Sequence, residues 1–311
     1  MSRKPNDYLM IGLKGIAMGA ADVVPGVSGG TIAFISGIYE ELLTSIRNLP
    51  ACFPLIFKKG QGIAAFWRKA NLNFLLVLVL GIGISFLSLI RLMTWLLEQH
   101  PIPTWAFFFG LILASTVYVF RDVEPKRTAN WLALLVGAGA AYWVTVMPPS
   151  DTPQTYWFIF LSGAIAICAM ILPGISGSFI LLLMGKYVFM MDALISVKID
   201  IIVTFVAGAA IGIMLFSNVL IWLLKKYHQV TVALLGGTMI GSLNKIWPWK
   251  ETVSSDSHDK ELPLAETNVW PQKFQAVTGE DHLALHAIVS VIIGFVIVFA
   301  IEYVAQRMKR Q

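Results

Sequence analysis

The sequence predicts an all-α, polytopic membrane protein with inverted-topology repeats, each a re-entrant helical hairpin followed by three transmembrane helices. Composition is the first observation: of 311 residues, 57% are hydrophobic and 13% are charged, whereas soluble proteins carry roughly 25% charged residues. The second is a motif that interrupts an apolar segment at residues 25–31 (PGVSGGT) and again at 173–178 (PGISGS). Proline removes a backbone donor and glycine loosens the backbone, so both places should break a helix.

The first repeat is expected to occupy residues 1–147. Its hairpin, 8–46, has two apolar parts that are each too short for the ~30 Å core of a bilayer. Basic residues flank both ends of this hairpin, so we expect it to enter from the cytoplasm and return there. Three spans should follow, at 74–97, 104–120 and 131–147.

Two further readings of the N-terminal region stay open at this point. Residues 51–70 are basic and aromatic, which fits either an interfacial stretch on the inner leaflet or a plain cytoplasmic loop. Residues 3–21 resemble a cleavable signal peptide. Lys14 interrupts that apolar run and the segment belongs to an internal repeat, so we expect it to be retained.

The second repeat is expected at residues 156–304. Its hairpin, 156–196, should enter from outside, and spans should follow at 201–224, 230–246 and 283–303. Residues 247–282 form a polar loop rich in Asp and Glu, which we place on the extracytoplasmic side. The short loops on the other side carry most Lys and Arg, which predicts cytoplasmic N- and C-termini.

Two blocks of identities relate the halves. In the first block the matched positions are Pro25, Gly26, Ser28, Gly29, Gly37 and Tyr39 with Pro173, Gly174, Ser176, Gly177, Gly185 and Tyr187. In the second they are Gly81, Trp95, Thr104, Gly110 and Ser115 with Gly208, Trp222, Thr231, Gly237 and Ser242. Two blocks in the same order indicate duplication. Three spans separate the hairpins, so the second copy should be upside down, as in many secondary transporters that work by alternating access.

The breaks predict an anion site. After each break a half-helix should begin inside the membrane, and unpaired amides and hydroxyls at helix N-termini bind anions. The expected phosphate-binding residues are Gly26, Ser28, Gly29, Gly30, Thr31, Gly174, Ser176, Gly177 and Ser178. The alternative is that these small residues only permit close helix packing.

Charged residues inside apolar segments are the other candidates, because such charges are costly in a bilayer. Lys14 and Arg91 are expected to help bind the anion, although Arg91 could instead extend toward the outer face. Asp22, Glu40 and Glu41 are candidates for a coupling ion. Asp22 could equally cap local backbone or pair with Lys14, and the two glutamates could simply lie near the inner surface.

Several functions are not supported by the composition. The net charge of +5 arises from basic residues in short loops, which is a topology signal and predicts no nucleic-acid partner. Cys52 and Cys168 have no metal-ligand spacing, and we expect no metal, no cofactor and no catalytic residues. Two rivals remain: an intramembrane serine hydrolase, because residues 26–30 match G-x-S-x-G, and an inorganic-anion channel or exchanger.

The doubled motif resembles that of the PopT family of bacterial polyprenyl-phosphate transporters, long filed as a domain of unknown function, over nearly the whole chain. The resemblance implies a membrane-lipid substrate, undecaprenyl phosphate, whose head group returns from the outer to the inner leaflet of the cytoplasmic membrane for reuse in cell-wall synthesis. It implies that the motif residues bind the head group. The second copy has Ser178 and Phe179 where the first has Gly30 and Thr31, so symmetric use of the halves stays open, as does a homo-oligomer.

Overall fold

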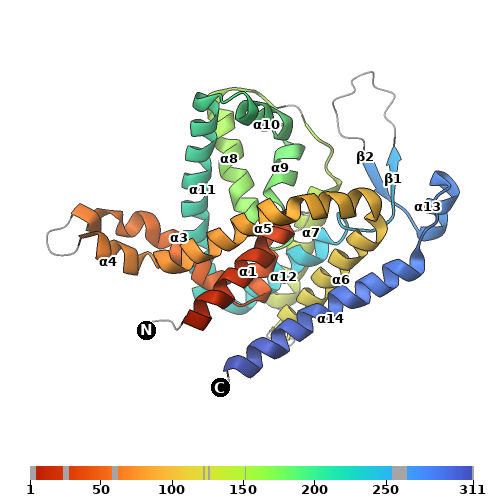
Figure 1. The fold of residues 1–311 in the computed structure, drawn as a ribbon, viewed down its shortest axis with the longest axis horizontal. Coiled ribbons are helices and arrows are strands. Elements are labelled where there is room, and N and C mark those ends of the chain that lie inside the picture. Colours follow the sequence, from red (N-terminus) through yellow and green to blue (C-terminus); the bar gives the residue numbers. More distant parts are fainter. Residues whose placement is uncertain are drawn as a thin grey trace.

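The computed structural model describes residues 5–23, 28–57, 62–121, 123–124, 127–150, 152–253 and 265–309. Helices make up most of this described chain, as predicted (Figure 1). The helices of the first half are α1 (Pro5–Val23), α2 (Gly29–Ile35), α3 (Tyr39–Cys52), the 3-10 helix η1 (Phe53–Phe57), α4 (Gly62–Lys69), α5 (Leu72–Gln99), α6 (Pro101–Phe120) and α7 (Thr128–Val146). The remaining helices are α8 (Tyr156–Ile171), α9 (Gly177–Leu183), α10 (Tyr187–Ile195), α11 (Ile199–Lys226), α12 (His228–Ser242), α13 (Pro271–Thr278) and α14 (Ala284–Lys309).

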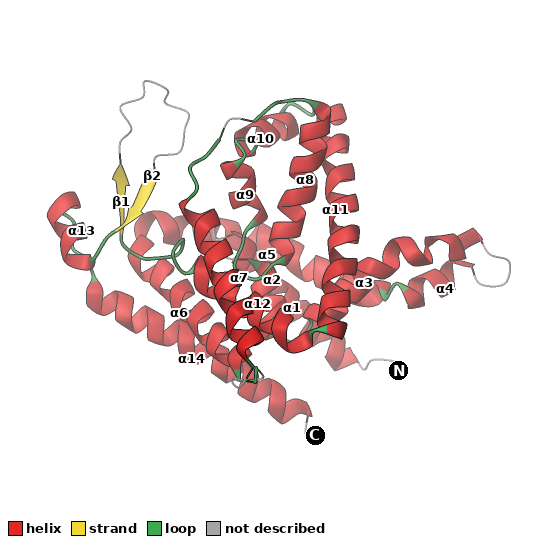
Figure 2. Ribbon diagram, turned by 180° about the vertical axis from the view of Figure 1, so that it is seen from behind, coloured by secondary structure: helices red, strands yellow, loops and turns green. Residues whose placement is uncertain are grey.

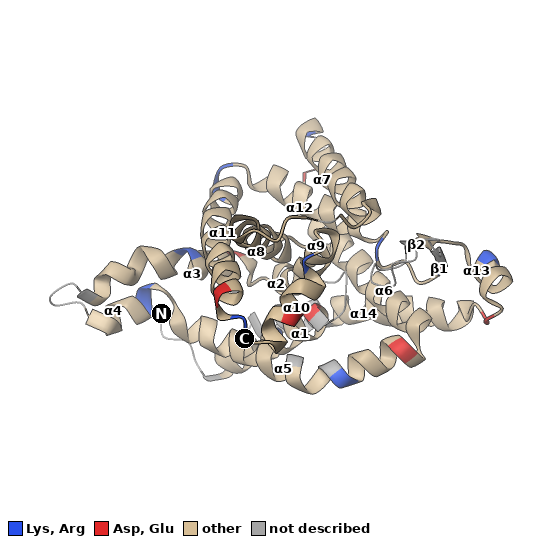
Figure 3. Ribbon diagram, turned by 90° about the horizontal axis from the view of Figure 1, so that it is seen from above, with Lys and Arg blue, Asp and Glu red and all other residues tan. Residues whose placement is uncertain are grey.

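Among the described residues, four helices are long and apolar enough to cross a membrane: α5, α6, α7 and α11. Large apolar side chains cover their outer surfaces; Leu87, Leu135 and Leu215 are 80%, 64% and 64% exposed. So much exposed apolar surface is stable in lipid and unfavourable in water. Few basic or acidic positions interrupt the bundle (Figure 3). The chain is a multi-pass membrane protein.

Both predicted hairpins, 8–46 and 156–196, are broken a second time, after the motif, where a single apolar part was expected. Gly37 separates α2 from α3 with a φ of 71°, and Gly185 separates α9 from α10 with a φ of 61°. This left-handed backbone is accessible to glycine at no steric cost and cannot continue a helix. The axes of α9 and α10 differ by 107°, so the second segment turns sharply inside the fold.

Four helix pairs carry the closest packing: α1 with α5, α8 with α11, α6 with α14, and α7 with α12. In each pair a glycine from each helix lies against the backbone of its partner, where an added Cβ atom would overlap a carbonyl oxygen. The glycine pairs are Gly15 and Gly81, Gly163 and Gly208, Gly110 and Gly294, and Gly137 and Gly237. Small residues that let backbones approach are the typical means of helix association in lipid.

The predicted loop at 247–282 has secondary structure of its own, which adds a small two-stranded sheet to the helical membrane protein that was predicted. Strands β1 (Lys250–Val253) and β2 (Ala265–Asn268) form an antiparallel pair, and α13 follows beside them (Figure 2). Lys273 of α13 forms an ion pair with Glu251 of β1 at 2.9 Å. The preceding helix, α12, ends at Ser242, before the predicted end of its span at 246, because the next residues turn and Asn244 Nδ2 donates to Thr145 Oγ1 at 2.8 Å.

Residues 51–57 and 62–70 form an arm beside the bundle, built from the end of α3, η1 and α4 (Figures 1 and 2). Phe53, Ile63 and Trp67 of this arm are 54%, 66% and 40% exposed. Exposed aromatic and aliphatic side chains beside Arg68 and Lys69 are compatible with the interfacial reading of this segment. That reading stays a prediction.

Candidate functional site

The first break lies between α1 and α2. Residues 24–27, which include Gly26, lie outside the described part of the chain. Ser28 is the N-cap of α2, with extended backbone, and its Oγ accepts the Gly30 N–H at 3.1 Å. A serine at this position satisfies a helix amide that would otherwise lack a partner.

Asp22, in the last turn of α1, caps the same N-terminus of α2. Its Oδ1 accepts the Gly29 N–H at 2.7 Å, while the Thr31 N–H donates to the Ser28 carbonyl at 2.9 Å. The expectation that these amides are unpaired is therefore wrong in this conformation. The alternative reading of Asp22, as a cap on local backbone, is confirmed. A carboxylate favours a helix N-terminus because it is negative, as a phosphate is.

The second break lies between α8 and α9 and is capped differently. Ser176 is the N-cap of α9 and has extended backbone, but its side chain makes no capping hydrogen bond. Instead its Oγ lies 2.8 Å from Ser178 Oγ. Ser176 is buried and Ser178 is exposed, so this pair of hydroxyls reaches from the interior to an accessible surface.

The two breaks meet in the middle of the molecule. Ser28 Oγ donates to the Met170 carbonyl at 2.8 Å, and the Gly174 N–H donates to Thr31 Oγ1 at 2.9 Å. Gly30 packs against the end of α8 so closely that an added Cβ would lie 2.5 Å from the Ile171 carbonyl oxygen. Ser28 and Thr31 are fully buried. Motifs far apart in the sequence thus form one continuous polar junction.

The hydroxyl of Thr31 gives a direct test of this junction. Thr31→Val keeps the shape of the side chain but leaves the buried Gly174 N–H without its acceptor, a cost of about 1–3 kcal/mol. We expect a lower midpoint of thermal unfolding in detergent for Thr31→Val and a near-native midpoint for Thr31→Ser, which keeps the hydroxyl. Equal midpoints for the two variants would contradict this role.

The predicted basic residues do not converge on the junction in the described contacts. Lys14 Nζ donates to the Ser36 carbonyl, at the end of α2, at 2.7 Å. Arg91 is exposed on α5. A third basic residue, Lys186 in the second hairpin, is 1% exposed, and its Nζ donates to the Thr152 carbonyl at 2.5 Å. Anion binding by Lys14 or Arg91 stays a prediction.

The two candidate glutamates lie in the first turn of α3. Glu41 Oε1 accepts from Asn71 Nδ2 at 2.7 Å, and Glu40 Oε1 lies 3.8 Å from His228 Nδ1. Both line an open polar cavity of about 520 Å³ between α3 and the start of α5. Their role in coupling also stays a prediction.

Sequence reasoning missed contacts that α12 and the following turn make with the second break. Thr238 Oγ1 donates to the Pro173 carbonyl at 2.8 Å, and Lys245 Nζ lies 4.9 Å from the centre of the Phe179 ring. Lys245 follows Ser242 by three residues, and Ser242 Oγ would lie 2.7 Å from an added Cβ on Gly174. Ser242 is one of the repeat-matched positions, but the sequence carried no signal for a cation beside the motif, because this contact depends on how α12 packs against the second break.

The serine motif lacks the surroundings of a hydrolase in the described structure. Ser28 Oγ is engaged by Met170 and Gly30, rather than by a histidine that could take its proton. His228 lies beside Glu40, and His282 contributes its carbonyl to Trp249 Nε1 at 2.7 Å. In this structure the Ser28 hydroxyl is thus occupied by backbone groups of both breaks.

Fold and site define a class: a multi-pass membrane protein in which two interrupted apolar segments contact each other through their breaks. The chain belongs to the VCA0040-like family, described as undecaprenyl phosphate translocase-like, whose model matches residues 18–262. The chain is 47% identical over 309 residues to a polyprenyl-phosphate transporter of Vibrio cholerae serotype O1, covering 99% of this chain and 100% of that protein. It is 34% identical over 254 residues to a polyprenyl-phosphate transporter of Staphylococcus aureus, covering 76% of this chain and 85% of that one. No solved structure matches.

Proposed function

We propose that this protein transports undecaprenyl phosphate from the outer to the inner leaflet of the bacterial cytoplasmic membrane, with both termini in the cytoplasm. Family membership and the names of the relatives support the substrate class. The observation that carries the proposal is the junction itself, where Ser28 reaches Met170 and Gly174 reaches Thr31. Interrupted helices meeting inside an apolar bundle are typical of transporter substrate sites.

The transport cycle rests on an inverted repeat, for which the glycine contacts provide support. Gly15 and Gly163 are separated by the same interval as Pro25 and Pro173, and Gly81 and Gly208 by the same interval as Trp95 and Trp222. The carbonyl oxygens that these glycines contact are related in the same way. Leu78 and Phe205 are separated by the interval of the second block, and Gly12 and Phe160 by that of the first. A shared packing scheme of this kind gives two halves of similar energy, which can exchange inward-open and outward-open shapes.

The α6–α14 and α7–α12 pairs extend the same relation. Gly110 and Gly237 are again separated by the interval of the second sequence block, and their partners are Val291 and Leu134. In both pairs a helix of the first half packs against a helix of the second. We assign these crossed pairs to the frame of the transporter, against which the broken segments move.

The phosphate head group is held, in this proposal, between the two helix starts. The exposed Ser178 lies next to Phe179, over whose ring Lys245 is placed, so a cation and a hydroxyl lie close together at the second motif. On the first motif, Asp22 occupies the Gly29 amide. Because a carboxylate and a phosphate repel each other, Asp22 must be displaced or protonated before the phosphate binds there. Asp22 is therefore our first candidate for coupling.

The experiment is transport by the purified protein in sealed vesicles. Undecaprenyl phosphate is placed in the outer leaflet, and the fraction accessible to a phosphatase added outside is measured over time. We expect accessibility to fall with time only in vesicles that contain the protein. Chloride flux without lipid movement would support an anion channel instead. The absence of both activities would refute the proposal.

A further inference from the structure

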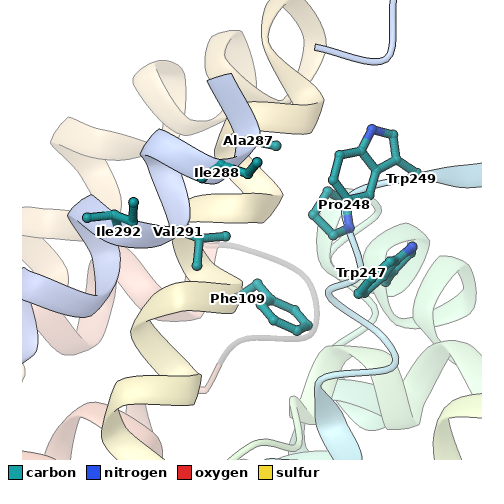
Figure 4. A pocket seen from close by; sticks show the side chains of 8 residues that line it. All are labelled: Phe109, Trp247, Pro248, Trp249, Ala287, Ile288, Val291 and Ile292. Carbon is teal, nitrogen blue, oxygen red and sulfur yellow. The ribbon is translucent and has the colours of Figure 1, made fainter. Parts of the chain in front are cut away.

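A second candidate binding site lies away from the junction, beside the N-terminal part of α14 and the middle of α6. It is a pocket of about 210 Å³ between these two helices and the connection that follows α12 (Figure 4). Phe109 of α6 points toward Trp247, while Ile288, Val291 and Ile292 of α14 lie across from the connection (Figure 4). Only apolar atoms are exposed to its interior.

The aromatic wall of this pocket is held in place by hydrogen bonds made elsewhere. Trp247 Nε1 donates to the Val269 carbonyl at 2.8 Å, and Trp249 Nε1 donates to the His282 carbonyl at 2.7 Å. The Trp247 ring centre lies 5.6 Å from that of Phe109 and 5.6 Å from that of Trp249. With their N–H groups engaged, the indoles offer hydrocarbon-like surface in a preformed shape. The volume exceeds the ~150 Å³ of a cavity that takes up benzene.

The pocket opens to the lipid side, and a cation lies near it. Ile288 and Ile292 are 56% and 55% exposed, so a chain in the bilayer can reach it sideways. Lys250 directly follows Trp249, and its Nζ lies 4.5 Å from the centre of the Trp105 ring, one turn before Phe109 in α6. An apolar slot whose Trp249 wall is followed directly by a lysine fits an amphiphile with a hydrocarbon chain and an anionic head.

We propose that this pocket binds the isoprenoid chain of the lipid phosphate next to its head group, with Lys250 beside the phosphate, before the head group enters the junction. The inference rests on the proposed function and adds the place where the substrate is first held. A slot of this volume holds only the first isoprene units of a single branched chain, and the rest of that chain stays in the bilayer. A phospholipid would have to leave one of its two chains wholly outside. The cation complements the phosphate charge.

Neighbouring lipid-facing residues of α14 give matched tests. Ile292 lines the pocket and Ile293 does not, and they are 55% and 48% exposed. In phosphatidylcholine nanodiscs, we expect Ile292→Trp to lower the affinity for farnesyl monophosphate at least about tenfold, since it removes contact with several buried carbons. Ile293→Trp should stay within about twofold of the wild type, as surface substitutions usually do.

A second pair guards against a folding artefact. Ile288 lines the pocket and Val289 does not, and Ile288→Trp and Val289→Trp should repeat the contrast. For the charge, Lys250→Gln should weaken binding, while Lys273→Gln, which removes the partner of Glu251, should not. Thermal unfolding midpoints of all variants are measured alongside.

The outcomes separate the two proposals. Unchanged affinity in Ile292→Trp and Ile288→Trp, equal loss in the control variants, or equal competition by phosphatidylglycerol would overturn the pocket assignment. Each of these results leaves the proposed transport intact if wild-type vesicles still move undecaprenyl phosphate. Failure of that movement overturns the proposed function, whatever the nanodiscs show.

Discussion

Replacing Gly30 by alanine is expected to reduce lipid-phosphate translocation at least about tenfold, because an added Cβ would lie 2.5 Å from the Ile171 carbonyl oxygen and 2.9 Å from that of Met170. Both are backbone atoms of α8, so the two breaks must separate, at a typical overpacking cost of about 1–3 kcal/mol. The Ser28 to Met170 hydrogen bond would lengthen with them. Misplacement of this order can cost a binding site most of its activity.

The steric effect of the added Cβ can be distinguished from the effect of alanine on helix propensity, because the two have opposite signs. Alanine is the better helix former by roughly 1 kcal/mol, so propensity alone would make Gly30→Ala neutral or stabilising. Gly139→Ala in α7 is the matched control, since nothing lies within 4 Å of its added Cβ. Translocation in vesicles and the unfolding midpoint are measured for both. Wild-type translocation by Gly30→Ala would show that the close approach of the breaks is not needed.

Replacing Asp22 by asparagine is expected to separate substrate affinity from turnover. The asparagine Oδ1 can still accept the Gly29 N–H, which Asp22 holds at 2.7 Å, but its charge is gone. For two charges about 4 Å apart, the repulsion removed is on the order of 1–4 kcal/mol, so the apparent KM for undecaprenyl phosphate should fall at least about fivefold. Turnover should fall as well, because the neutral side chain no longer helps to expel the phosphate.

Transport by Asp22→Asn should also lose the pH dependence that wild-type transport owes to this carboxyl. Initial rates in vesicles, measured against lipid concentration at several pH values, test both statements. Asp192→Asn is the control, because Asp192 is paired with Lys198 at 2.8 Å on the surface. A raised KM in Asp22→Asn would mean that the carboxylate assists binding, and unchanged kinetics would exclude Asp22 from the cycle.

The helical membrane class could be predicted from the sequence because it depends on composition and on the length of apolar runs. Helices α5, α6 and α7 lie close to the predicted spans. The second breaks at Gly37 and Gly185 were matched in sequence but not recognised as breaks, because their left-handed conformation is one of several that a glycine can adopt. The strands at 250–253 and 265–268 were missed because so polar a segment carries no hydrophobic alternation.

The candidate site was predictable only in part. The motif residues Ser28, Thr31 and Gly174 could be named because proline and glycine in an apolar run are conspicuous. That a carboxylate would already occupy the Gly29 amide was open, because Asp22 had several partners within reach. The approach of Lys245 to Phe179 could not be read from charge patterns, since it depends on how α12 packs against the second break.

The crossed helix pairs have a consequence for synthesis of the protein. Gly110 of α6 fits against the backbone at Val291 of α14, and α14 is synthesised after all the other described helices. The N-terminal half therefore cannot reach its final packing until α14 has been synthesised. Until then, lipid or an insertion factor must cover the glycine face of α6. A chain truncated before residue 284 would leave that face permanently open to quality-control proteases.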